Sequence, residues 1–256
     1  MDELRNSLMQ LFADSGLVAL KAGTEVEDMT FAEIAFLKEL GDPILPLIVK
    51  IGGPEARNDI RACREIGVHG ILAPMIESAY GLRNFVEATA DIYRQERRPY
   101  LAINIETVTA YAHLDEIMGS PWFDSIDQVT VGRSDLSASM DGAPDDDAVI
   151  AATRAIVHKA SALGKNTSVG GKISPANAAL VCERIAPSRI NTRHMVYDPV
   201  RCGDLADAVA RGLQFEEELC ERLAEIEPTK RATYRERISA TRARIATTPL
   251  PCCAAN

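Results

Sequence analysis

The sequence predicts an α/β fold, a (β/α)8 barrel of the TIM type followed by a C-terminal helical extension. Short apolar runs alternate with longer helix-like segments from residue 17 to residue 193, and near-continuous apolar runs are typical of parallel strands covered on both faces. Polar or charged residues follow nearly every apolar run, and the carboxyl ends of all strands in a barrel meet at one mouth. An open doubly wound sheet shares the alternation, so the strand ends favour the barrel.

Seven strands are predicted from the apolar runs. They lie at residues 17–21, 45–51, 70–75, 100–106, 128–132, 166–170 and 189–193. A closed barrel of this type needs an eighth strand. Either a short strand lies near residues 194–197, or an N-terminal helix over residues 1–15 replaces part of one unit, and the sequence leaves both possibilities open.

The segments between these strands have helical patterns. Apolar residues recur at three-residue steps through residues 31–40, which places them on one side of a helix. A second helix is predicted to begin at Pro54 and to end at Gly67, because proline near the start and glycine just past the end are typical of helices. The pair Ser174-Pro175 marks the start of a third helix over residues 175–186.

After the seventh strand the chain is predicted to be helical, so we divide it into a catalytic barrel domain, residues 1–203, and an extension, residues 204–256. Residues 204–226 carry leucine and other apolar residues at helical spacing. Residues 229–246 form a basic helix with a narrow apolar stripe, which favours a solvated face or packing on the barrel or a neighbouring subunit. The tail at 249–256 is expected to be disordered.

Composition excludes several classes of function. The net charge of −9 argues against a general affinity for nucleic acid or for anionic membranes. We expect neither a membrane span nor a secretory signal, because the chain has no long apolar run and no basic leader. The six cysteines show no paired or zinc-like spacing, which favours reduced thiols and a cytoplasmic protein.

Two carboxylates stand just past strands that are neighbours in the predicted barrel. Glu106 ends the run YLAINIE and Asp135 follows the run QVTVG. Burying a lone carboxylate is costly, and two like charges at one mouth do not both stay ionised without a cation between them. A divalent ion such as Mg²⁺ or Mn²⁺ fits a site of two carboxylates. An arginine salt bridge or, for Asp135, a helix N-cap fits the residues equally well.

The segments IETVTAYAHLDEIM and VGRSDLSASMD, with PMIES upstream, resemble motifs of the HpcH/HpaI aldolase family, which is related to the citrate lyase β subunit. The resemblance runs through roughly residues 17–200. It implies a TIM barrel with a divalent metal ion, Mg²⁺ ahead of Mn²⁺ or Co²⁺, held by Glu106 and Asp135. It also implies a metal-dependent carbon–carbon lyase, a class II aldolase, that acts on a 2-oxo acid through a metal-stabilised, pyruvate-like enolate. An aldehyde partner and a homo-oligomer, a trimer or hexamer, follow from the same resemblance.

The resemblance also assigns substrate contacts. Asn104 lies two residues before Glu106, where the family's aldolases carry glutamine, and would orient the substrate or a metal-bound water. The backbone around Gly132 and Ser134 would bind the substrate carboxylate. Arg133 replaces a proline usual in these aldolases and would add to substrate recognition.

The resemblance implies that Lys50, which replaces an arginine of the family, stabilises the enolate. A Schiff base on Lys50 is a less favoured alternative. The histidine that transfers protons in the family has no counterpart in LKAGTEVEDM, residues 20–29. Of the residues left there, Lys21, Glu25 and Glu27, we assign proton transfer to Lys21 or Glu25.

Two further strand-end residues are candidates for substrate binding. Glu77 either faces the substrate or caps a helix at the surface, and Arg193 either binds an anionic group or forms a structural salt bridge. Two other functions stay open: an acyl-CoA ester lyase like citrate lyase, and a non-catalytic barrel that serves as a binding or assembly subunit. The missing histidine and the lysine in place of arginine keep the second of these open.

Overall fold

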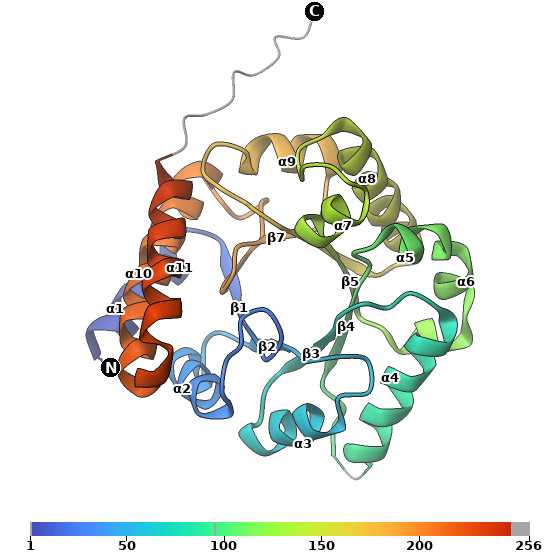
Figure 1. Cartoon of the computed structure of the whole chain (residues 1–256), viewed down its shortest axis with the longest axis horizontal. Coiled ribbons are helices and arrows are strands. Elements are labelled where there is room, and N and C mark those ends of the chain that lie inside the picture. Colours follow the sequence, from blue (N-terminus) through green and yellow to red (C-terminus); the bar gives the residue numbers. More distant parts are fainter. Residues whose placement is uncertain (1, 95, 247–256) are drawn as a thin grey trace, which may run out of the picture.

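A computed structural model describes residues 2–94 and 96–246 of the chain. Eight strands close into a barrel in the order β1 to β8, which confirms the predicted fold (Figure 1). The strands are β1 Leu17–Gly23, β2 Leu47–Lys50, β3 Gly70–Ala73, β4 Tyr100–Asn104, β5 Gln128–Gly132, β6 Asn166–Gly170, β7 Arg189–Asn191 and β8 Met195–Tyr197. The tail expected at residues 249–256 lies outside the described residues.

Helices surround the ring of strands (Figure 1). They are α1 Asp2–Asp14, α2 Phe31–Gly41, α3 Arg57–Ile66, α4 Ala79–Ile92, α5 Val108–Ala112, α6 Leu114–Gly119, α7 Arg133–Ser139, α8 Asp147–Ala162, α9 Ala178–Ile185, α10 Leu205–Ile226 and α11 Arg231–Ile245, with short 3₁₀ turns at η1 Pro121–Ser125 and η2 Pro228–Lys230. The helix predicted from Pro54 begins three residues later and ends as predicted, with Gly67 left-handed at φ 76°. No helix in the described part of the chain is long and apolar enough to cross a membrane.

The eighth strand lies where one of the two alternatives placed it, but it runs against its neighbours. Strands β1 to β7 pair in parallel, whereas β8 pairs antiparallel with both β7 and β1. Residues 192–194 alone connect β7 to β8, and a parallel crossover needs about a dozen residues or more. The last unit is therefore a hairpin, which departs from the predicted (β/α)8 repeat, and its turn lies at the mouth of the barrel.

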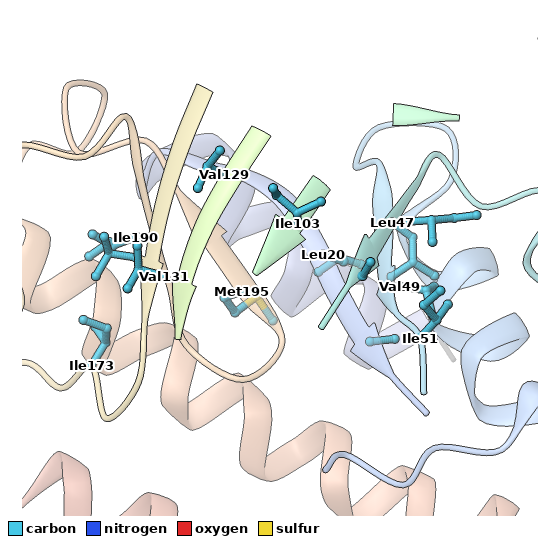
Figure 2. Close-up of a cluster of buried hydrophobic side chains, with 14 of the residues drawn as sticks. Leu20, Leu47, Val49, Ile51, Ile103, Val129, Val131, Ile173, Ile190 and Met195 are labelled. Carbon is cyan, nitrogen blue, oxygen red and sulfur yellow. The ribbon is translucent and has the colours of Figure 1, made fainter. Parts of the chain in front are cut away.

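The strands bury apolar side chains on both faces. Val49, Ile103 and Val131 belong to the large cluster between the strands and the helices (Figure 2). A small second cluster fills the inside of the barrel and consists of Ala19, Ile48, Leu72, Ala102 and Val196. Side chains two residues apart on a strand point to the same face. Lys21, Lys50 and Asn104 follow Ala19, Ile48 and Ala102 by two residues and so form a polar layer above this apolar plug.

The basic helix α11 packs along α10 of its own chain, and α10 packs against α1 (Figure 1). The apolar stripe of α11 is narrow, and polar contacts supplement it. Tyr234 is fully buried and donates a hydrogen bond to Glu33 at the start of α2. Arg237 donates to the backbone carbonyl of Glu27 over 2.7 Å. These contacts fix α11 beside the segment that links β1 to α2.

Gly212 provides a test of the packing between α10 and the barrel. A Cβ atom at this position would overlap the hydroxyl of Tyr197, whose side chain is fully buried on β8. We expect Gly212→Ala to lower the free energy of unfolding by about 1–3 kcal/mol through overpacking, as measured by urea denaturation. Gly81→Ala is the control, because a Cβ atom added at Gly81 on α4 would lie 3.6 Å from the hydroxyl of Ser78, an ordinary van der Waals contact. That change should raise stability by up to about 1 kcal/mol. A Gly212→Ala protein as stable as the native one would contradict the described packing.

Candidate active site

A cavity of about 180 Å³ opens at the mouth of the barrel. The residues predicted for the site that line it are Lys21, Lys50, Asn104, Glu106, Gly132, Ser134, Asp135 and Arg193. Other polar residues that line it are Glu27, Thr130, Lys172, Asn191, Thr192 and Arg244. The predicted residues lie at or just after the carboxyl ends of β1, β2, β4, β5 and β7, so the convergence of strand ends expected for a barrel brings them together.

Lys50 is a buried cation between two carboxylates. Its Nζ atom lies 2.6 Å from Oε2 of Glu25 and 3.5 Å from Oε2 of Glu106. Burial alone would lower the pKa of Lys50, but the negative charges of Glu106 and Glu25 outweigh burial and raise it. Lys50 therefore stays protonated, which suits the stabilisation of negative charge better than the formation of a Schiff base.

Glu106 is held in one orientation by its neighbours. Its Oε1 accepts a hydrogen bond from the backbone N–H of Met75 over 3.1 Å, and its Oε2 accepts one from Nδ2 of Asn104 over 2.6 Å. Burial raises the pKa of Glu106, Lys50 opposes this shift, and the charge of Asp135 adds to it. The two carboxylates are thus close enough to repel each other.

Asp135 lies in the first turn of α7 and faces the cavity. It is not the N-cap of that helix, a position held by Gly132. Within residues 2–94 and 96–246, its carboxylate makes no hydrogen bond and no ion pair. Oδ1 of Asn104 is also buried without a hydrogen-bond partner in this part of the chain. The cavity therefore has oxygen acceptors left open for a ligand.

Glycines at the strand ends make room for these polar groups. A Cβ atom at Gly132 would lie 2.5 Å from Oε2 of Glu106. A Cβ atom at Gly171 would lie 2.5 Å from the backbone nitrogen of Ser134, and Gly171 also has a φ of 91°, which side chains rarely adopt. Both glycines are required where they stand, one beside the carboxylate of Glu106 and one beside the amides that begin α7.

The cavity is electropositive although the chain as a whole is acidic. Five basic side chains line it against three acidic ones, whereas the net charge of the chain is −9. Glu27 shows the effect, because burial opposes its ionisation but Lys21, His194 and Arg193 lower its pKa below the usual value. A cavity with this excess of positive charge favours a small anionic ligand.

Several lining residues were not predicted as site residues. Glu27 lies two residues after Glu25, and nothing in the local sequence separates the two acids. Lys172 follows the pair of glycines that ends β6, a pattern that could have marked it as a residue of the mouth. Arg244 lies on a helix far along the chain, and only the packing of α11 brings it to the cavity.

Arg133 was predicted to contact the substrate, but it does not line the cavity and is fully buried. Its guanidinium group donates hydrogen bonds to the carbonyls of Pro144, Gly170 and Gly171 and to the carboxylate of Asp145. These contacts use most of the donors of the group and turn it away from the mouth. Arg133 instead ties the start of α7 to the loop after β6.

Glu77 and Glu25 also lie outside the lining of the cavity. Glu77 accepts a hydrogen bond from the hydroxyl of Thr107, the N-cap of α5, over 2.6 Å and so braces a neighbouring loop. This contact does not fit its predicted role in substrate binding. Glu25 acts on the site through its ion pair with Lys50 rather than by facing the cavity itself.

The structural role of Arg133 can be tested against a surface arginine. Arg133→Met would leave three carbonyls and a carboxylate without their donor, so we expect the free energy of unfolding to fall by roughly 3 kcal/mol. Arg98→Met is the control, because Arg98 also binds an aspartate, Asp127, but is half exposed. Its loss should cost less than about 1 kcal/mol. Equal effects of the two changes in urea denaturation would contradict the role given to Arg133.

Comparisons with known proteins agree with this architecture. An HpcH/HpaI aldolase/citrate lyase family protein from Burkholderia cenocepacia J2315 superposes with a TM-score of 0.59 at 17% identity, over 74% of this chain and 82% of that one. An HpcH/HpaI aldolase from Desulfitobacterium hafniense DCB-2 superposes with a TM-score of 0.58 at 18% identity, over 72% of this chain and 79% of that one. The citrate synthase SbnG superposes with a TM-score of 0.54 at 17% identity, over 70% of this chain and 86% of that one. At these identities the likeness shows a shared fold.

Among curated proteins no sequence matches this chain. The model of one family does match it, over residues 43–169, and that family is described as HpcH/HpaI aldolase/citrate lyase. The matched range contains both the IETVTAY segment and the VGRSDLSASM segment, so it includes the two carboxylates of the mouth. The chain belongs to the HpcH/HpaI aldolase/citrate lyase family.

Proposed function

We propose that this protein is a metal-dependent carbon–carbon lyase of the class II aldolase type that acts on a 2-oxo acid. The observation that carries the proposal is the placement of Glu106 and Asp135 at one electropositive cavity, beside the buried cation Lys50. An aldehyde is the other partner that such a cleavage requires. We infer the reaction class from the family and the roles of individual residues from their positions at the cavity.

The residues present fit a divalent metal ion such as Mg²⁺. No group of three or more histidine, cysteine or acidic side chains that could hold a metal occurs in the part of the chain that the structure describes. Mg²⁺ does not need such a group, because it is commonly bound by one or two carboxylates with water and substrate as the other ligands. Glu106 and Asp135 would be the two carboxylates, and the open Oδ1 of Asn104 would accept a hydrogen bond from a bound water.

When bound, a divalent ion would polarise the carboxylate and ketone oxygens of the 2-oxo acid. The protein's own groups would do the rest. Lys50, held by Glu25 and Glu106, would stabilise the negative charge that develops on the substrate. The amides at Gly132 and Ser134, beside the loop of Gly171, would orient the substrate carboxylate.

Proton transfer falls to Lys21 and Glu27, the two groups of the β1 end that line the cavity. Glu25, the alternative considered from sequence, is engaged with Lys50. Glu27 is ionised at neutral pH because the surrounding cations lower its pKa, so it can accept a proton. Lys21 would then be the donor.

The proposal is tested by following enolisation of pyruvate as exchange of its methyl protons in deuterium oxide with Mg²⁺, measured by nuclear magnetic resonance. Glu106→Gln and Asp135→Asn should each reduce the exchange rate by at least about 100-fold, because each removes a charge next to the reacting oxygens. Glu77→Gln is the matched control, since this acid lies outside the cavity in the loop between β3 and α4. The exchange rate of this variant should differ from the native rate by less than about two-fold.

Removal of the metal with a chelator should abolish the exchange, and added Mg²⁺ should restore it. Exchange that persists in Glu106→Gln and Asp135→Asn proteins would show that the site is assigned wrongly. A native protein that catalyses no exchange of any 2-oxo acid in a broad panel would contradict the enzyme proposal and favour a binding or assembly role.

Lys50 provides a second test, in which the exchange rate and the affinity for Mg²⁺ should change in opposite directions. Lys50→Met should lower the exchange rate by about 100-fold through loss of charge stabilisation. The affinity for Mg²⁺, measured by titration calorimetry, should rise in the same protein, because a cation that competes for Glu106 has been removed. Lys50→Arg should keep part of the activity. Loss of both activity and metal affinity in Lys50→Met would contradict the assigned role.

A further inference from the structure

One wall of the cavity does not come from a strand–helix loop. Because β8 runs antiparallel, the β7–β8 turn takes the place of a last crossover at the mouth. This turn supplies Thr192 and Arg193 to the lining of the cavity, and α11 supplies Arg244. The C-terminal extension is thus part of the cavity, and two guanidinium groups lie on this wall. Strand β6 separates it from the β5 end that carries Asp135.

A single buried carboxylate connects the turn to the helix. Glu216, on α10, is only 2% exposed. Its Oε1 accepts hydrogen bonds from the hydroxyl of Thr192 over 2.6 Å and from the backbone N–H of His194 over 2.7 Å. Its Oε2 lies 3.5 Å from Nη2 of Arg244. Glu216 therefore fixes the residues on both sides of Arg193 and also holds Arg244.

Arg193 acts on the nearby Glu27 through its charge, which lowers the pKa of that carboxyl group. The side chain of Arg193 makes no hydrogen bond and no ion pair with any residue of the described ranges, although it lines the cavity. Burial lowers the pKa of Arg244, the charge of Glu216 opposes this shift, and the charge of Arg193 adds to it. The two guanidinium groups therefore act on each other. Two neighbouring guanidinium groups repel each other unless an anion lies between them, and carboxylates fit guanidinium groups well.

We propose that Arg193 and Arg244 bind a second carboxylate of the substrate, at the end remote from the ketone, and that Glu216 positions both arginines. This inference rests on the proposed function and narrows its substrate class to 2-oxo dicarboxylates. The ketone end occupies the part of the cavity near Glu106 and Asp135, and the far carboxylate reaches the wall formed by the β7–β8 turn and α11.

The test compares the binding of pyruvate, which has one carboxylate, with that of 2-oxoglutarate, which has two, by titration calorimetry with Mg²⁺. Arg193→Ala and Arg244→Ala should each weaken the binding of 2-oxoglutarate by about 10-fold to 100-fold, the range for a lost hydrogen bond to a charged group. The binding of pyruvate should weaken by less than about two-fold.

Arg242→Ala is the matched control, because Arg242 lies two residues from Arg244 on the same helix, pairs with Glu217 of α10 and has a side chain 65% exposed. It should leave both ligands unchanged.

The role of Glu216 has its own readout, the ratio of the two dissociation constants. Glu216→Ala frees both the turn and Arg244, so the preference for 2-oxoglutarate should fall as far as in Arg244→Ala. Glu216→Gln keeps an oxygen that can accept from Thr192 and His194, so it should restore part of the preference. Glu217→Gln should not alter it. Equal thermal midpoints of the Glu216→Gln and native proteins would show that the fold is kept.

The outcomes separate the two proposals. Native protein that binds neither 2-oxo acid overturns the proposed function and this inference together. Native protein that binds both acids, with Arg193→Ala and Arg244→Ala weakening both equally, overturns this inference alone. Tighter, arginine-dependent binding of phosphonopyruvate than of 2-oxoglutarate would overturn the choice of a carboxylate in favour of a phosphate-like group.

Discussion

The arrangement of the mouth depends on the buried contact of Lys50 with Glu25 and Glu106. A carboxylate as buried as Glu106 is costly without a partner, and the ammonium group of Lys50, 3.5 Å from its Oε2, supplies a compensating positive charge. Glu25 contributes a second negative charge, so Lys50 is fixed rather than mobile. The ammonium group of Lys50 is therefore held in place at the site before any ligand binds.

The contact between Lys50 and Glu106 also bears on how a cation would bind at this site. In the proposed function, Glu106 would be shared between Lys50 and a cation next to Asp135, whereas Asp135 has no such partner in the described chain. The two acids therefore differ in their surroundings. Glu106 links the cavity to the polar layer of Lys50 and Asn104, and Asp135 leaves its oxygens open at the start of α7.

The barrel was predictable from sequence because its signals are local. The predicted strands at 128–132 and 166–170 coincide with β5 and β6, and each is a short segment that ends at a glycine before the helical pattern resumes. The positions of Lys50 and Asp135 at strand ends also brought them to the cavity as expected.

The direction of a side chain could not be predicted in the same way. Arg133 lies between two residues that line the cavity, yet its side chain turns into the protein, because backbone carbonyls of neighbouring loops accept its hydrogen bonds. Arg244 and Glu216 could not be found, because their contribution depends on how α10 and α11 pack, which no local pattern encodes. The direction of β8 likewise follows from a connection too short for a crossover.

The antiparallel pairing of β8 with β1 has a consequence for the order in which the protein folds. β1 can meet β2 soon after both are made, but the seam between Leu17 and Tyr197 joins segments from opposite ends of the barrel. Contacts of such high sequence separation carry a large entropic cost of loop closure and form late. Until they form, β1 has one unpaired edge, and α1 lacks the surface of α10 on which it packs. We therefore expect the ribosome to release most of the barrel as an open sheet, and the site to assemble only when the last helices arrive.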